Sequence, residues 1–217
     1  MIDCYFISGL GADKAVFSRL KLRKDIVVHH LPWLKPHYDE KIEHYACRMA
    51  EEIENPQEAV LIGLSFGGMM AIEIAKLFNV KQTILISSIK KDDEMPPWLR
   101  FIGNTGMHKL VAIDKLLQQR ELSMRFFGCN SKDDRVMLQR LLDEADLETV
   151  AWSIDRALNW KNQIIPDRLV HIHGTADTVF PKLFSSPDYW IEQGSHFMVF
   201  SQAEKTSVLL NAIISEG

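Results

Sequence analysis

The chain has 217 residues, of which 47% are hydrophobic and 25% are charged, and its formal net charge is −4. This size and composition are typical of one soluble globular domain with a modest insertion, and the negative charge argues against nucleic-acid binding. No apolar run approaches the roughly 20 residues that cross a bilayer, and residues 1–5 lack the basic start of a signal peptide. We therefore expect a soluble protein with neither a membrane nor a nucleic-acid partner.

The cysteines give no indication of disulfides or of a metal site. Cys4, Cys47 and Cys129 are odd in number, and their spacing is not that of metal ligands. Unpaired thiols used in packing are typical of a reducing compartment, so they favour a cytoplasmic location.

The first part of the chain alternates short apolar strands with helices. Strands are expected at residues 2–8, 25–31, 59–62 and 81–88, and helices at 12–20, 38–54 and 69–78. Strands that alternate with helices predict a parallel sheet with helices on both faces. In such a sheet the functional site lies at the carboxyl ends of the strands.

The alternation stops after residue 89, where a polar stretch with two prolines leaves the predicted core. A helical region follows, and Ser131 and Asp134 form a capping box at the start of one of its helices. We interpret residues 90–165 as a helical lid inserted near the site. Large aromatic side chains either line an apolar cavity beneath this lid or form the core of the lid itself: Trp98, Phe101, Phe126 and Phe127.

The core resumes after the predicted lid. Two more strands are expected, at residues 168–173 and 189–192. Ser201 and Glu204 match a capping box that opens a final helix. The residues of this helix predicted to face the sheet are Val208, Leu209, Ala212 and Ile213. The core of the single domain thus comprises residues 1–89 and 166–217.

One serine stands between a buried strand and a helix. The stretch from Gly63 to Gly68 packs three glycines around Ser65, in the pattern G-x-S-x-G. The tight turn from strand to helix requires residues without a Cβ atom, because the two backbones nearly touch there. The free N–H groups at the helix N-terminus then point back at the serine, where they stabilise negative charge on a substrate oxygen. The spacing of a phosphate-binding loop is not found.

Asp177 and His196 are the candidate partners of Ser65. Both lie in loops predicted at the carboxyl ends of strands, at the same edge as the serine. A serine hydroxyl needs a neighbouring base, and the base needs an acceptor that fixes its tautomer. We predict that Ser65 is the nucleophile, His196 the base and Asp177 the acid, with Asp92 or Asp93 as the alternative acid.

Two further histidines raise the question of a metal site. His171 and His173 lie on one face of a predicted strand, but no third ligand accompanies them. We therefore predict neither a metal site nor a cofactor.

Together these motifs resemble the α/β-hydrolase superfamily over nearly the whole chain, including its order of serine, acid and histidine. The matching stretches are Phe-Ile-Ser-Gly-Leu-Gly at 6–11, Gly-Leu-Ser-Phe-Gly-Gly at 63–68, His-Gly-Thr-Ala-Asp at 173–177 and Gly-Ser-His-Phe at 194–197. The resemblance implies an α/β-hydrolase fold and an oxyanion hole formed by the backbone N–H groups of Leu10 and Phe66. The position of the lid is similar to that in small lidded serine esterases.

Three features depart from the pattern of the superfamily. Its first loop usually contains His-Gly, whereas this chain has Ser8-Gly9. The sequence starts directly at the first parallel strand, so we expect the sheet to lack the usual two preceding antiparallel strands. The stretch between Pro181 and Tyr189 has room for barely one turn of helix. We therefore expect a trimmed, mostly parallel sheet of about six strands.

The leading interpretation is a serine hydrolase that cleaves a carboxylic ester, with a small to medium acyl group, through an acyl-enzyme intermediate. Acyl transfer, C–C bond hydrolysis and lyase chemistry use the same site residues, so the sequence does not separate them from ester hydrolysis. A non-catalytic ligand-binding module is a third alternative, although a receptor has no need of all three groups. In each case the expected partner is a small molecule.

Overall fold

The structure is a computed structural model that describes residues 1–216. Its centre is one sheet of six parallel strands in the order β2-β1-β3-β4-β5-β6. The strands are β1 (Ile2–Ile7), β2 (Ile26–Leu31), β3 (Val60–Leu64), β4 (Gln82–Ile86), β5 (Leu169–Gly174) and β6 (Tyr189–Ile191). Both the trimmed parallel sheet and the six predicted strands are confirmed.

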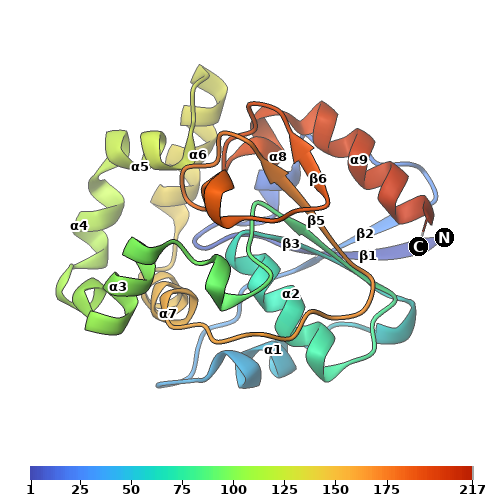
Figure 1. The fold of residues 1–217 in the computed structure, drawn as a ribbon, viewed down its shortest axis with the longest axis horizontal. Coiled ribbons are helices and arrows are strands. Elements are labelled where there is room, and N and C mark those ends of the chain that lie inside the picture. The colour runs from blue at the N-terminus through green and yellow to red at the C-terminus, as the bar shows by residue number, and fades with distance from the viewer. Residues whose placement is uncertain (217) are drawn as a thin grey trace.

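Helices cover both faces of the sheet (Figure 1). One face packs on α1 (Ile42–Ala50) and α2 (Phe66–Leu77), and the other on α8 (Met198–Ser201) and α9 (Ala203–Glu216). Neighbouring residues of the central strand β3 divide between the two layers, since Leu61 packs on the first face and Ile62 on the second. This double burial explains why β3 is apolar along its whole length instead of alternating with polar residues.

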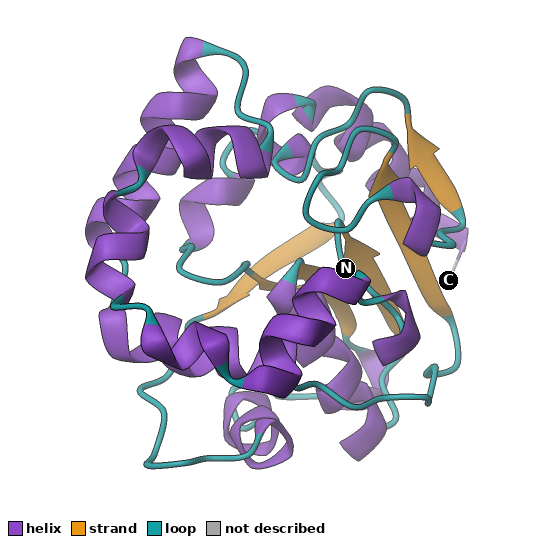
Figure 2. Cartoon of the chain, turned by 60° about the vertical axis from the view of Figure 1, so that its left-hand side comes forward, coloured by secondary structure: helices purple, strands orange, loops and turns teal. Residues whose placement is uncertain are grey.

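The segment between β4 and β5 contains the inserted helices, which lie beyond the end of the sheet where the strands finish (Figures 1 and 2). They are α3 (Pro97–Thr105), α4 (Ile113–Gln118), α5 (Arg120–Phe127), α6 (Lys132–Glu144) and α7 (Leu147–Leu158). The capping box at α6 is present, because the side chains of Ser131 and Asp134 each accept the other's backbone N–H. Helix α3 ends at Gly106, which adopts a positive φ of 69°.

Helix α1 is shorter than the predicted helix at 38–54. Asp39 has a positive φ of 49°, which a right-handed helix does not allow. Tyr38 is fully exposed, and the Glu40 carboxylate accepts the backbone N–H of His37 in a local turn. The helix therefore begins only at Ile42. The helix expected at 12–20 is likewise reduced to the 3₁₀ turn Lys14–Phe17.

The predicted inner face of the last helix is correct only in part. Ile213 is buried and Leu209 packs partly buried against the core, as predicted, whereas Val208 is 66% exposed and Ala212 is exposed. Helix α9 instead buries Leu210 and Ile214 beside Ile213. The sequence has apolar residues on two adjacent stripes of this helix, so helical periodicity alone does not choose between them. The capping box with Ser201 is also wrong, because Ser201 ends α8 and its hydroxyl donates to the Phe197 carbonyl at 3.2 Å.

Within residues 1–216 every helix is too short or too polar to cross a lipid bilayer. The same residues contain no cluster of three or more His, Cys, Asp or Glu side chains arranged to hold a metal ion. The three cysteines are free, and burial raises the pKa of Cys4 and of Cys129 to about 12.

Candidate active site

Ser65 occupies a strained turn between β3 and α2. Its φ of 53° and ψ of −120° lie outside the regions that serine normally adopts. Two glycines permit the turn: a Cβ atom on Gly63 would lie 2.3 Å from the Gly67 carbonyl oxygen, and one on Gly67 would lie 2.3 Å from that of Ser8. The G-x-S-x-G pattern therefore reflects real backbone contacts between β1, β3 and the start of α2.

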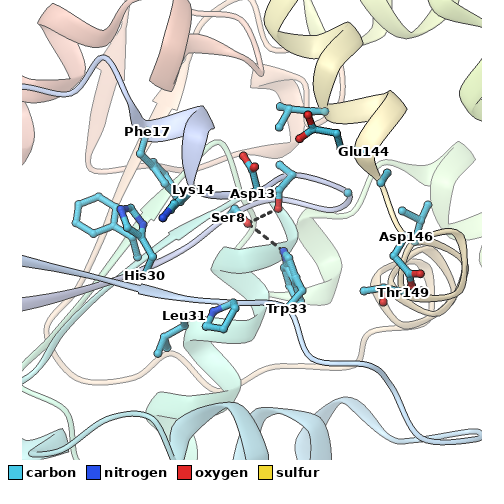
Figure 3. Close-up of a pocket in the computed structure, with 17 residues that line it drawn as sticks. Ser8, Asp13, Lys14, Phe17, His30, Leu31, Trp33, Glu144, Asp146 and Thr149 are labelled. Carbon is cyan, nitrogen blue, oxygen red and sulfur yellow. Dashed lines mark hydrogen bonds between the residues drawn. The ribbon is translucent and has the colours of Figure 1, made fainter.

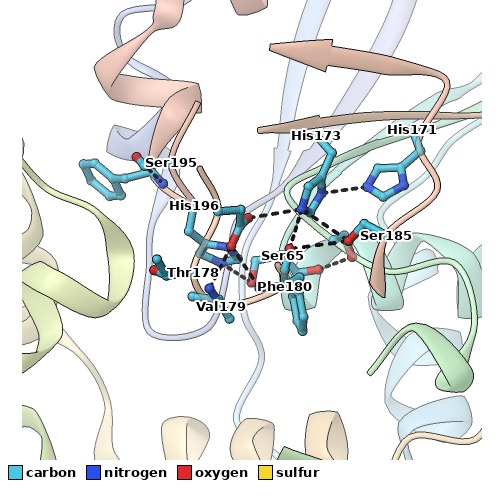
Figure 4. A network of polar contacts seen from close by, with 12 residues as sticks. Ser65, His171, His173, Thr178, Val179, Phe180, Ser185, Ser195 and His196 are labelled. Carbon is cyan, nitrogen blue, oxygen red and sulfur yellow. Dashed lines mark hydrogen bonds and ion pairs between the residues drawn. The ribbon is translucent and has the colours of Figure 1, made fainter. Parts of the chain in front are cut away.

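Three side chains predicted to act together lie within hydrogen-bond distance (Figure 4). His196 Nε2 lies 2.9 Å from Ser65 Oγ, and His196 Nδ1 lies 2.8 Å from Asp177 Oδ2. Asp177 follows β5 and His196 follows β6, so parallel strands bring both loops to the edge where Ser65 ends β3. Asp177 and His196 are each only 4% exposed.

The loops that carry Asp177 and His196 are joined directly. The Ala176 N–H donates to the Gly194 carbonyl at 2.9 Å. A Cβ atom on Gly174 would lie 2.1 Å from that same carbonyl oxygen, so the two loops approach too closely for any side chain there. This contact fixes the separation of the acid from the histidine.

Asp177 is held as a carboxylate. Its Oδ1 accepts the backbone N–H groups of Val179 and Phe180 at 2.8 and 2.9 Å. Burial opposes ionisation, but the charge of His196 and the hydrogen bonds outweigh it and lower the pKa of Asp177. The other carboxylate oxygen remains directed at His196 as an acceptor.

The other candidate acids lie elsewhere. Asp92 and Asp93 belong to a 3₁₀ turn at the start of the insertion. The Asp92 carboxylate contacts Gln163 and lies 3.9 Å from the Lys161 ammonium. The geometry therefore favours Asp177 as the partner of His196.

His171 and His173 form a buried pair (Figure 4), and His173 Nε2 lies 3.5 Å from Asp177 Oδ2. His173 Nε2 donates to the Phe180 carbonyl at 2.8 Å, and its Nδ1 lies 3.1 Å from His171 Nε2. Burial lowers the pKa of both histidines, although the Asp177 charge opposes this at His173. These contacts suit two neutral imidazoles that support the acid loop.

The two predicted oxyanion donors lie beside Ser65. Phe66 is the first residue of α2, and Leu10 lies in the loop after β1. Within residues 1–216 no acceptor takes the backbone N–H of either residue. Both residues line the same cavity as Ser65 and His196, which is consistent with the predicted oxyanion hole.

The cavity at Ser65 has two apolar lobes, of about 520 and 380 Å³. Ser65 and His196 line both lobes and therefore stand where they meet. Among the described residues, the other polar groups in the lining are the Ser123 hydroxyl and the Trp98 indole in the larger lobe and, in the smaller lobe, His108, which pairs with Asp155 at 2.9 Å. Such walls suit an uncharged ligand with apolar groups on both sides of its reacting atom.

Of the two alternatives for the four aromatic side chains, cavity lining applies to three of them. Trp98 lines the larger lobe, and Phe126 and Phe127 line both lobes. Phe101 fits neither alternative, because it is 61% exposed and lines neither lobe. Phe101 lies on α3 away from the face that carries Leu99 and Ile102 into the cavity.

The end of α5 is fastened to both loops of the site. Thr178 Oγ1 donates to the Phe126 carbonyl at 2.6 Å, and the Phe197 N–H donates to the Phe127 carbonyl at 3.2 Å. Gly128 follows with a positive φ of 70°, and a Cβ atom there would lie 2.5 Å from that of Ser195. These contacts were not predicted from the sequence, in which Gly128 after two aromatic residues is the local feature that marks them.

Comparison with known proteins agrees with this geometry. The model of the alpha/beta hydrolase family matches residues 5–207, whereas no curated protein matches the chain in sequence. The solved structures similar to the chain include an esterase from Thermogutta terrifontis, with 14% identity, a TM-score of 0.73, and 100% of this chain and 90% of that chain covered.

Two other similar structures are named for different reactions. A meta-cleavage product hydrolase from Pseudomonas fluorescens has 15% identity and a TM-score of 0.70, with 100% of this chain and 91% of that chain covered. An enol-lactonase from Burkholderia xenovorans has 14% identity and a TM-score of 0.71, with 99% and 91% covered. At such identities the structures share the fold alone, but the family model spans most of the sequence. The chain therefore belongs to the α/β-hydrolase family.

Proposed function

We propose that the protein is a serine hydrolase that cleaves carboxylic esters through an acyl-enzyme intermediate. The observation that carries the proposal is the continuous chain of contacts from Ser65 Oγ through the His196 ring to the Asp177 carboxylate, with distances of 2.9 and 2.8 Å. Asp177 keeps the proton of the neutral ring on Nδ1, so the lone pair of Nε2 faces the serine hydroxyl.

In the first half of the reaction His196 takes the Ser65 proton as the hydroxyl oxygen attacks the ester carbonyl carbon. The backbone N–H groups of Leu10 and Phe66 bind the oxyanion, and the N-terminus of α2 adds its positive dipole end. The tetrahedral intermediate collapses, the bond to the alcohol oxygen breaks, and His196 returns the proton to the leaving alcohol. Water then attacks the acyl-enzyme by the same route and releases the acid.

The substrate that suits the cavity is an uncharged ester with apolar groups on both sides of the ester bond. The described residues that line the two lobes include no Asp, Glu, Lys or Arg, so a charged acyl or alcohol group would lose its hydration without compensation. We further propose that the inserted helices act as the lid of this cavity and set the accepted acyl size. A small molecule is thus the expected partner.

Ester hydrolysis is favoured over ligand binding alone by the strain at Ser65. A receptor gains nothing from a serine held at φ 53° against a histidine, whereas a nucleophile does. Acyl transfer, C–C bond hydrolysis and lyase reactions use the same groups, and no feature of the site favours one of them over water as the acceptor.

Covalent labelling tests the proposal. A fluorophosphonate probe should modify the wild-type protein at one serine, and a series of p-nitrophenyl esters should give turnover that a metal chelator does not reduce. The Ser65→Ala variant should lose both activities. Ser123→Ala is the matched control, because it removes another serine hydroxyl from the cavity wall and should retain labelling. Labelling that persists without Ser65 would contradict the assignment of the nucleophile.

A further inference from the structure

The loop after β1 is closed by the side chain of Ser8. The buried Ser8 hydroxyl donates to the Ala12 carbonyl at 2.6 Å and accepts the indole N–H of Trp33 at 3.0 Å (Figure 3). The Ala12 N–H in turn donates to the Gly9 carbonyl at 3.0 Å. Leu10 lies inside the turn that these bonds close.

Packing alone does not hold this loop. Gly11 and Ala12 line the larger lobe at Ser65 and also a separate cavity of about 700 Å³, which Figure 3 shows around Ser8 and Trp33. The loop is therefore a thin wall with open space on both sides. It also contains two glycines, of which Gly11 has a positive φ of 67°. Such a segment has many alternative conformations, so its hydrogen bonds determine where the Leu10 N–H points.

Trp33 also contacts the other oxyanion donor. Its ring stacks on that of Phe66, with the ring centroids 5.4 Å apart and the planes at 12°. The Tyr45 hydroxyl bonds both the N–H and the carbonyl of Leu34, at 2.6 and 2.7 Å, and so fixes the backbone next to Trp33. Trp152 packs edge to face against another side of the Phe66 ring, with the ring centroids 5.9 Å apart. One tryptophan thus links the two residues that carry the oxyanion donors.

We propose that Ser8 and Trp33 are positioning residues that preorganise the oxyanion hole, an inference that rests on the proposed function. Trp33 holds Leu10 through the Ser8 hydroxyl and holds Phe66 through ring stacking. An oxyanion hole requires donors about 2.7–3.1 Å from the developing charge, so a loop that shifts by 1 Å loses much of the stabilisation. Ser8 stands where the superfamily usually has histidine, and here it supplies this connection.

The test compares an ester with the thionoester of the same acid and alcohol. Sulfur is a weaker hydrogen-bond acceptor than oxygen and is larger. The ratio of kcat for the oxygen ester to kcat for the thionoester therefore reports how well the oxyanion hole binds oxygen. Ser8→Ala should lower kcat for the oxygen ester by about 10- to 100-fold with little change in KM, and should lower the ratio by a similar factor. Ser8→Thr retains a hydroxyl and should recover most of the wild-type kcat and most of the wild-type ratio.

A second variant isolates the indole N–H. Trp33→Phe keeps a ring that can stack on Phe66 but removes the bond to Ser8, and it should lower kcat and the ratio by about tenfold. Ser8→Ala and Trp33→Phe remove the same hydrogen bond. The kcat of the double variant should therefore be less than about twofold below the kcat of Ser8→Ala. Trp160→Phe is the matched control: it removes a buried indole hydrogen bond, to Glu73 at 2.7 Å, and should lower stability without changing the ratio.

The outcomes separate two kinds of failure. Folded variants at Ser8 and Trp33 with the wild-type ratio would overturn the positioning role, and Trp33→Phe decides the matter if Ser8→Ala does not fold. Lack of turnover and of Ser65 labelling in the wild-type protein would refute the proposed function itself.

Discussion

Replacing Asp177 with asparagine tests the proposed role of the acid without changing the shape of the side chain. Asp177 Oδ1 accepts two backbone N–H groups, from Val179 and Phe180, and only an oxygen can replace it there. The amide oxygen of the variant will therefore take this position and direct its NH₂ group at His196 Nδ1. That nitrogen must then act as an acceptor, which moves the proton of the neutral ring to Nε2.

The consequence is a histidine that presents an N–H to Ser65 and accepts no proton from it. The expected fall in kcat is about 10⁴-fold, equivalent to about 5.5 kcal/mol of lost transition-state stabilisation, as for the same substitution in serine proteases. Initial rates with a p-nitrophenyl ester measure this, with circular dichroism to show that the fold is retained. Asp92→Asn is the control and should keep near-normal activity. An Asp177→Asn variant within tenfold of wild type would refute the reasoning.

Three further expectations follow from the described contacts. Gly67→Ala should destabilise the fold by about 3 kcal/mol or more in thermal unfolding, because its Cβ would lie 2.3 Å from the Ser8 carbonyl oxygen; an unchanged midpoint would contradict this. Burial lowers the pKa of His171 and of His173, so as the pH falls through about 6.5 the unfolded chain takes up their protons before the folded chain does. The free energy of unfolding should then fall by up to about 1.4 kcal/mol per pH unit for each, and urea titrations at pH 7.5 and 5.5 measure the difference. Phe126→Ala widens the junction of the lobes and should shift the preferred p-nitrophenyl ester to longer acyl chains while fluorophosphonate labelling persists; loss of labelling in a folded variant would contradict the proposed role of the insertion.

The features that the sequence predicts well are those with a local signature. The strand at β3 is apolar on both faces, and the glycines around Ser65 mark a turn that only small residues allow. The parallel topology then places the three site loops together, because it brings the carboxyl ends of β3, β5 and β6 to one edge of the sheet. The closeness of Ser65, Asp177 and His196 was therefore predictable without knowledge of any contact between them.

The features that the sequence does not predict depend on partners far away in the chain. Trp33 and Ser8 are 25 positions apart, and neither belongs to a periodic pattern that points to the other. The inner face of α9 depends on how that helix rests on the sheet, because its sequence offers two apolar stripes. The start of α1 depends on one left-handed residue, Asp39, which its residue type permits but does not require.

The attachment of α5 to the acid and histidine loops has a consequence for how the insertion moves. A flap joined to the core only at its two ends would swing open as one body, but Phe126, Phe127 and Gly128 tie its middle to Thr178, Ser195 and Phe197. If the insertion acts as a lid, as proposed, an opening that keeps these contacts would displace α3 and α4 and leave the end of α5 in place. A chimaera that carries the insertion of a relative should therefore keep these three residues, because their contacts position the two loops that hold Asp177 and His196.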